Sequence, residues 1–98
     1  MTRSLETILK KANSWIDSGH KVTMATVIET WGSSPCQVGS KMIVNDKGDF
    51  LGSVSGGCVE ANVINECLEL MKKKNLFKKM HFTVQDESAW SVGLACGG

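Results

Sequence analysis

The chain has 98 residues, of which 42% are hydrophobic and 21% charged, an ordinary balance for a soluble globular domain. Eleven basic and ten acidic residues give a net charge of +1, which offers no electrostatic basis for binding nucleic acid. No apolar run approaches the roughly 20 residues that a membrane span requires, and the first residues lack the features of a secretory signal. We therefore expect one cytoplasmic domain over residues 1–98, without a membrane contact.

Two segments show apolar residues at helical spacing. The first covers residues 4–17 and is followed by Gly19, which is typical of a helix end. Its apolar stripe comprises Leu5, Ile8, Leu9, Ala12 and Ile16. The second covers residues 58–74, and its stripe includes Cys67, which we interpret as a core residue. These two patterns predict the main helices of the domain.

The segments between and after these helices have the composition of strands. Residues 21–30 are evenly apolar and β-branched, which predicts a central strand buried on both faces. Residues 41–45 and 50–54 flank a turn that ends at Gly48, the pattern of a β-hairpin.

The C-terminal part continues this pattern. Residues 79–84 alternate between apolar and polar side chains, with His81 on the wetter side. An acidic turn or a single helical turn at 85–90 then leads into a short apolar run. The expected fold class is α+β, in the order helix, strand, hairpin, helix, strand, strand. We expect a small mixed β-sheet with the two helices packed on it.

The four cysteines are widely spaced and include no C-x-x-C pair. This spacing is poor for a structural zinc site, and a reducing compartment disfavours disulfides. The sequence therefore predicts four individual thiols and no metal site; the thiols are Cys36, Cys58, Cys67 and Cys96.

The stretch from Gly52 to Glu60 carries the clearest functional signal. It leaves an apolar strand, turns through Gly56 and Gly57, and opens a helix with Cys58 in its first turn. Paired glycines and a helix start expose backbone N–H groups, so this turn can hold an anion such as phosphate and favours the thiolate of Cys58. Ordinary turn chemistry around a small buried cysteine is the alternative interpretation.

Three glycine-bearing segments each follow a strand-like run. If their strands lie side by side, the three segments can converge at one sheet edge and bring thiols next to backbone donors. Such a site would suit a compact anion that also has an affinity for sulfur. The segments are Gly32-Ser33-Ser34-Pro35-Cys36, Ser55-Gly56-Gly57-Cys58 and Cys96-Gly97-Gly98.

Several motifs occur together in a fixed order, namely Val27-Ile28-Glu29-Thr30-Trp31-Gly32-Ser33-Ser34-Pro35, Gly39-Ser40-Lys41-Met42, residues 48–52, Gly56-Gly57-Cys58-Val59-Glu60 and Cys96-Gly97-Gly98. With these motifs the chain resembles the N-terminal domain of the XdhC/CoxI family. Members of that family are accessory factors for xanthine dehydrogenase and related molybdenum hydroxylases. The likeness runs from about Val22 to the last residue.

The resemblance implies that the domain binds the molybdenum cofactor (molybdopterin) transiently and protects it. It further implies help in replacing the terminal oxo group by sulfur and transfer of the cofactor to an apo molybdenum hydroxylase. The chain would then be a chaperone rather than an enzyme, with a sulfur donor protein as a second partner; a homodimer remains open.

The cofactor is an anionic pterin with a metal that prefers sulfur, so the expected binding residues combine glycine turns with thiols. Glu60 either fixes the turn as a first-turn carboxylate or contacts the ligand. No catalytic residue is predicted. The cofactor-binding set is Gly32, Ser33, Ser34, Pro35, Ser55, Gly56, Gly57, Cys58, Glu60, Cys96 and Gly97.

Two features depart from the family pattern. A basic residue usually follows the proline, and this chain has Cys36 there, so an anion contact is lost or a third thiol is gained. Longer members continue into a Rossmann-type domain, and residues 1–98 hold no dinucleotide fingerprint. The family's nucleotide-linked activity is therefore not extended to this chain.

Three other functions remain open from the sequence. The terminal Gly97-Gly98 would suit a sulfur-carrier protein, although such carriers usually open with a strand hairpin. A cysteine-dependent enzyme using Cys58 would need a general base, for which only His20 and His81 are present. The last is a partner-binding module without cofactor.

Overall fold

The computed structural model describes residues 5–32, 36–54, 59–73, 77–84 and 88–97. The described elements confirm the predicted α+β class and the predicted order of helices and strands. In chain order they are α1 (Leu5–Asp17), β1 (Val22–Trp31), β2 (Lys41–Asn45), β3 (Phe50–Gly52), α2 (Glu60–Lys73), β4 (Phe77–Val84) and β5 (Ser88–Gly97).

The five strands form one sheet in the order β3-β2-β1-β5-β4, with β1 at its centre. Each pairing among the described strands is antiparallel, so the sheet is not the mixed one expected from the sequence. The longest pairing joins β1 to β5 and runs from Val22 opposite Gly97 to Trp31 opposite Ala89. A β-bulge between Val27 and Glu29 interrupts its register.

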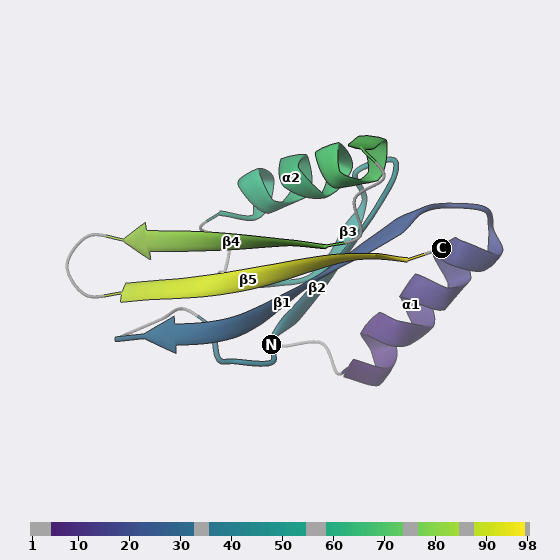
Figure 1. The fold of residues 1–98 in the computed structure, drawn as a ribbon. Helices are drawn as coiled ribbons and strands as arrows, with labels where there is room; N and C mark the ends of the chain where they lie inside the picture. Colours follow the sequence, from purple (N-terminus) through teal and green to yellow (C-terminus); the bar gives the residue numbers. More distant parts are fainter. Residues whose placement is uncertain (1–4, 33–35, 55–58, 74–76, 85–87, 98) are drawn as a thin grey trace.

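The two helices cover opposite faces of this sheet (Figure 1). Helix α2 packs over the main core cluster, in which Val63, Cys67, Leu70 and Met71 of the helix meet inward side chains of β1, β2 and β5. Helix α1 packs on the other face, where Ile8 and Ala12 meet Val22 and Ile43. Successive side chains of β2 alternate between these clusters, as the pleat of a strand requires.

Helix α1 ends where the sequence predicts. The N–H of Gly19 donates to the carbonyl of Ile16 and that of His20 to the carbonyl of Trp15, with Gly19 at φ 89°, which is a Schellman C-cap. Its apolar stripe, however, is only partly covered by the sheet. Ile8 and Ala12 are buried, whereas the exposed apolar residues of the helix are Leu5, Leu9 and Ile16.

Strand β1 is buried on both faces only in its first half, which corrects the prediction for the whole strand. Val22, Thr23, Ala25 and Val27 are buried, and the strand becomes exposed after the bulge. The reason is that neither helix reaches the second half on the α1 side of the sheet, so side chains there face solvent.

The β2–β3 hairpin forms around the predicted turn, although β3 ends at Gly52 and not at residue 54. Gly48 has φ 88°, and the side-chain oxygen of Asn45 accepts hydrogen bonds from the N–H groups of Lys47 and Asp49. Asn45 is buried, and these bonds satisfy its carbonyl oxygen inside the turn. The hairpin then delivers the chain toward the start of α2.

The acidic turn predicted at residues 85–90 is wrong at its C-terminal end, because β5 already begins at Ser88. Trp90 is a strand residue with no exposed surface. Its position opposite Thr30 of β1 and Phe82 of β4 places it in the core. Neither described helix is long and apolar enough to cross a membrane.

Candidate functional site

The expected binding residues divide into two sets. Glu60 and Cys96 are described with their side chains, Gly97 is described by its position in β5, and Gly32 follows directly after the end of β1. The remaining members lie outside the described residues; they are Ser33, Ser34, Pro35, Ser55, Gly56, Gly57 and Cys58. The geometry of the predicted site is therefore built from the residues that flank the diglycine turn and from the C-terminal strand.

The carboxylate of Glu60 ties the start of α2 to the end of the hairpin. Its Oε2 accepts a hydrogen bond from the hydroxyl of Ser53 at 2.5 Å and another from the N–H of Val54 at 3.2 Å. These contacts clamp together the two ends of the diglycine segment. Of the two roles expected for Glu60, this arrangement supplies the first, in which the first-turn carboxylate holds the turn.

Cys96 and Cys67 are neighbours beneath α2 with different environments. The Sγ of partly buried Cys96 lies 3.3 Å from the hydroxyl of Thr23, its partner across β1 and β5. Cys67 has no exposed surface, and burial, with further contributions from Cys96 and Glu66, raises the pKa of its thiol to about 12. Cys67 is the core residue predicted from its stripe, so Cys96 is the accessible thiol of this pair.

The described parts of the diglycine region and the C-terminal thiol share one face of the sheet. Val59, just before α2, and Cys96 both pack against the main core cluster under this helix. Glu60 and Cys67 are seven positions apart on α2, or about 10 Å along the helix axis. Glu60 at the start of α2 and Cys96 are thus on the same side of the sheet, roughly two helical turns from each other.

The expected convergence of all three glycine segments at one edge is wrong, because the first and the third lie at opposite ends of β1 and β5. Gly32 follows Trp31, which pairs with Ala89, whereas Cys96 pairs with Thr23 near the other end of β1. The carboxyl ends of antiparallel neighbours lie at opposite ends of the pair, here on the order of 25 Å apart at the rise of a strand. The residue pattern left the strand directions open, and the antiparallel pairing decides against a common edge.

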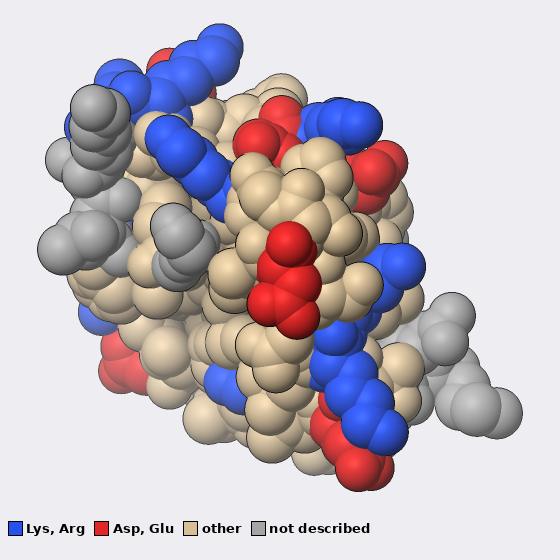
Figure 2. Space-filling view, turned by 90° about the vertical axis from the view of Figure 1, so that its right-hand side faces the viewer, with Lys and Arg blue, Asp and Glu red and all other residues tan. Residues whose placement is uncertain are grey.

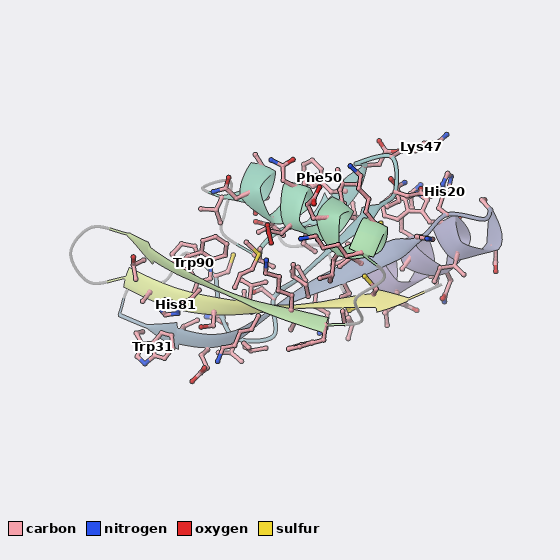
Figure 3. All side chains as sticks on the ribbon, turned by 45° about the horizontal axis from the view of Figure 1, so that its top comes forward. His20, Trp31, Lys47, Phe50, His81 and Trp90 are labelled. Carbon is pink, nitrogen blue, oxygen red and sulfur yellow. The ribbon has the colours of Figure 1, made fainter. Side chains whose placement is uncertain are left out.

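Trp90 is a polar core residue that the sequence did not single out as a site candidate. It stacks on Phe82 with ring centroids 5.5 Å apart, and its indole Nε1 is buried without a hydrogen-bond partner. Among the described residues it is the one buried side-chain nitrogen or oxygen in that condition. Figure 3 shows Trp90 beneath α2, with Trp31 and His81 on the far side of the sheet. The alternation of apolar side chains over residues 90–94 could have indicated that Trp90 is a strand residue in the core. The acidic residues just before it favoured a turn instead, so the start of the strand was not predicted.

The two histidines have partners away from the described thiols. His20 Nδ1 lies 2.8 Å from Asp46 Oδ1, and His81 Nδ1 lies 3.0 Å from the hydroxyl of Ser91. His81 is exposed, as predicted, and meets Trp31 edge to face. Within the described part of the chain no three His, Cys, Asp or Glu side chains gather closely enough to hold a metal ion.

Charged side chains form pairs rather than a patch of one sign. Lys78 pairs with Glu66, Lys79 with Glu29 at 3.3 Å and Lys72 with Glu69 at 3.8 Å. The face shown in Figure 2 likewise mixes basic and acidic side chains. This pattern agrees with the near-neutral net charge and with the lysines around the end of α2 forming a solvated face.

Comparisons with known proteins give concordant results. The model of the XdhC and CoxI family matches residues 15–82. The molybdenum cofactor insertion chaperone PaoD of Escherichia coli strain K12 is 33% identical over 99 residues, which cover 100% of this chain and 30% of that protein. A probable xanthine dehydrogenase subunit of Bacillus subtilis strain 168 is 26% identical over 84 residues, covering 85% of this chain and 26% of that protein.

A solved structure shares the fold. The crystal structure of a xanthine dehydrogenase from Bacillus halodurans matches with a TM-score of 0.73 and 20% sequence identity, over 90% of this chain and 30% of that one. At this identity the match concerns the fold alone. The chain spans less than a third of the length of each of these relatives.

Proposed function

Because the chain belongs to the XdhC and CoxI family, we propose that it binds the molybdenum cofactor and delivers it to an apo molybdenum hydroxylase of the xanthine dehydrogenase type. The observation that carries this proposal is the 33% identity to a molybdenum cofactor insertion chaperone over the whole chain. The second relative, a probable xanthine dehydrogenase subunit, supports the same class of client enzyme.

The described residues fit the chemistry of this cofactor at one point in particular. Molybdenum favours sulfur ligands, and a thiol must reach solvent to meet a ligand. Cys96 is partly exposed, whereas Cys67 is fully buried with a raised pKa, so Cys96 is the thiol we assign to the cofactor on this strand. When bound, the cofactor supplies the molybdenum centre that the client enzyme needs.

The protein's own part is to hold an anion close to that thiol. Glu60 closes the diglycine segment by accepting bonds from Ser53 and Val54. For the anionic end of the cofactor we propose the N–H groups of Gly56 and Gly57 as donors, on the sequence pattern of the segment that this clamp flanks. Cys58 completes the proposed set at the helix start. A sulfur donor protein remains part of this proposal as a second partner.

The direct test is titration of the chain with molybdenum cofactor released from a purified molybdoenzyme. We expect Cys58→Ala or Cys96→Ala to weaken binding by about tenfold, the scale of one lost charge-assisted contact. Lys47→Ala, at the exposed tip of the hairpin, is the control and should bind as the parent chain does. Unchanged affinity in both cysteine variants would remove the thiols from the mechanism, and absence of binding by the parent chain would refute the proposal.

The alternatives gain no support from the described residues. Gly97 is paired with Val22 within the sheet, where a sulfur carrier would need its glycines free for activation. His20 and His81 are engaged by Asp46 and Ser91, which leaves a cysteine enzyme without an evident base. A thiocarboxylate at the C-terminus, found by mass spectrometry, would nevertheless favour the carrier over the chaperone.

A further inference from the structure

Trp90 is the largest fully buried side chain among the described residues, although tryptophan usually keeps part of its surface in contact with water. Its indole Nε1 can only donate a hydrogen bond, and it has no acceptor within the described part of the chain. A buried donor without an acceptor raises the free energy of the folded state, and nearly all buried polar groups in folded proteins are paired. Packing alone therefore does not account for a tryptophan at this position.

The groups around the indole ring do not supply the acceptor. Phe82 stacks on the ring with centroids 5.5 Å apart and an interplanar angle of 30°, so the N–H runs nearly along the face of Phe82 and does not point into it. The other described members of the core cluster have aliphatic or sulfur-containing side chains. An oxygen acceptor for Trp90 would therefore have to come from a molecule that binds beside the ring.

Trp90 lies at the end of the sheet where α2 begins. Asn62, in the first turn of this helix, lines the same surface hollow as Phe82, which is the partner of Trp90 across β4 and β5. Figure 3 shows Trp90 on the α2 face of the sheet, near the beginning of the helix. Val54 and Val59, on either side of the diglycine segment, pack in the same cluster as Trp90. The unpaired donor is therefore near the segment for which the sequence predicts an anion.

The chemistry of this donor restricts the ligand. Because an indole N–H donates and cannot accept, its partner must present an acceptor, and an anionic oxygen forms the stronger bond. Burial and the stacking on Phe82 hold the ring in place, so the donor is oriented before a ligand arrives. These properties suit the phosphate of a pterin cofactor and exclude a cation as the partner of this group.

We propose that Trp90 is a binding residue of the cofactor site, and that its indole N–H donates to an anionic oxygen of the ligand held at the start of α2. The inference rests on the proposed function, because it assigns a further contact to the same ligand. Trp90 has no exposed surface, so ligand binding displaces side chains that cover the ring.

Nuclear magnetic resonance follows this donor directly. A chain labelled with the heavy nitrogen isotope gives an indole N–H signal for each tryptophan, and replacing Trp15, Trp31 and Trp90 in turn by phenylalanine assigns the signals. When molybdenum cofactor released from a purified molybdoenzyme is added, we expect the Trp90 indole proton to move downfield, because a proton that enters a hydrogen bond loses shielding. The signal of Trp15, on α1 and the other face of the sheet, should stay in place.

Binding by variants provides the second measurement. Trp90→Phe keeps an aromatic ring beside Phe82 and removes the donor, so we expect about tenfold weaker cofactor binding. Trp15→Phe is the matched control and should bind within about twofold of the parent. Benzothienylalanine, in which sulfur replaces the N–H, preserves the size of the ring. Incorporated at position 90 of a chain that carries phenylalanine at both other tryptophan positions, it should weaken binding to the same extent as Trp90→Phe.

The inference requires both the shift and the loss of affinity. If the parent binds the cofactor but the Trp90 signal stays in place, or if the variants without the donor bind as the parent does, the inference fails while the proposed function stands. A water molecule bonded permanently to the N–H would give that result. If the parent does not bind the cofactor, the proposed function fails and the inference fails with it. Circular dichroism checks that each variant is folded; if Trp90→Phe is not, the parent signal and the benzothienylalanine chain decide.

Discussion

The two faces of the sheet differ in how completely they are covered. Under α2, the core cluster includes fully buried side chains from β1, β2 and β5 together with the helix. On the other face, α1 covers only the region around Val22 and Ile43, and beyond it Ile28, Trp31 and Phe77 remain exposed. The covered face supplies stability, and the partly covered face leaves a cavity and apolar side chains open to solvent.

The strongest contrast lies in the thiols of the covered face. Because the pKa of Cys67 is raised from 9.0 to about 12, its thiolate fraction near neutral pH is about a thousandfold below that of an unshifted thiol. Alkylation with iodoacetamide, followed by peptide mass spectrometry, should therefore label the partly exposed Cys36 and Cys96 well before Cys67. Equal labelling rates would mean that α2 does not seal this face.

The hairpin on the other face depends on one close backbone approach. Gly52→Ala should lower the free energy of unfolding by about 3 kcal/mol or more, since it adds a steric overlap with Lys41 to an unfavourable φ. Gly48→Ala is the matched control, because its φ is 88° and nothing lies within 4 Å of the added carbon. That variant should cost about 1–2 kcal/mol. Urea unfolding measures both, and equal costs would contradict the close approach.

Serine substitutions at Cys67 and Cys96 compare a fully buried thiol with a partly exposed one. Cys67→Ser places a hydroxyl in the core cluster under α2 and should cost about 2 kcal/mol. Cys96→Ser keeps a partly buried group beside the Thr23 hydroxyl and should cost less than about 1 kcal/mol. Thermal unfolding followed by circular dichroism distinguishes them, and a larger loss for Cys96→Ser would reverse the assignment of core and accessible thiol.

The smallest expected effect concerns acid stability at the hairpin end. Partial desolvation opposes the shift, but hydrogen bonds with the His20 side chain and the Lys21 backbone hold the pKa of Asp46 below 3.8. The folded state thus gains stability that is present above pH 3.8 and is lost as pH falls through the lower folded-state pKa. We expect the free energy of unfolding of Asp46→Asn to fall slightly less steeply than that of the parent as the pH is lowered below 3.8, as measured by urea unfolding at several pH values. A steeper fall in the variant would exclude this contribution.

Residue type and spacing were sufficient to predict most helices, strands and turns. They were not sufficient where contacts between distant segments determine the structure. The stop at Gly19, the hairpin turn at Gly48 and the buried position of Cys67 follow from residue type and spacing. The start of β5 was missed because its pairing with β1 and β4 stabilises residues 88–90 as strand despite the adjacent acidic residues. The cavity at Lys41 was missed because its walls come from four separate segments.

What the amino-acid sequence determined by itself is the set of helices and strands, their order, and the family motifs, since these depend on residues close together in the chain. Only the tertiary structure decided that β1 and β5 run antiparallel, which separates Gly32 from Cys96. It also decided that α1 and α2 cover opposite faces unequally. Strand direction and helix placement depend on contacts between distant segments, and the spacing of residues along the chain does not show which segments are in contact.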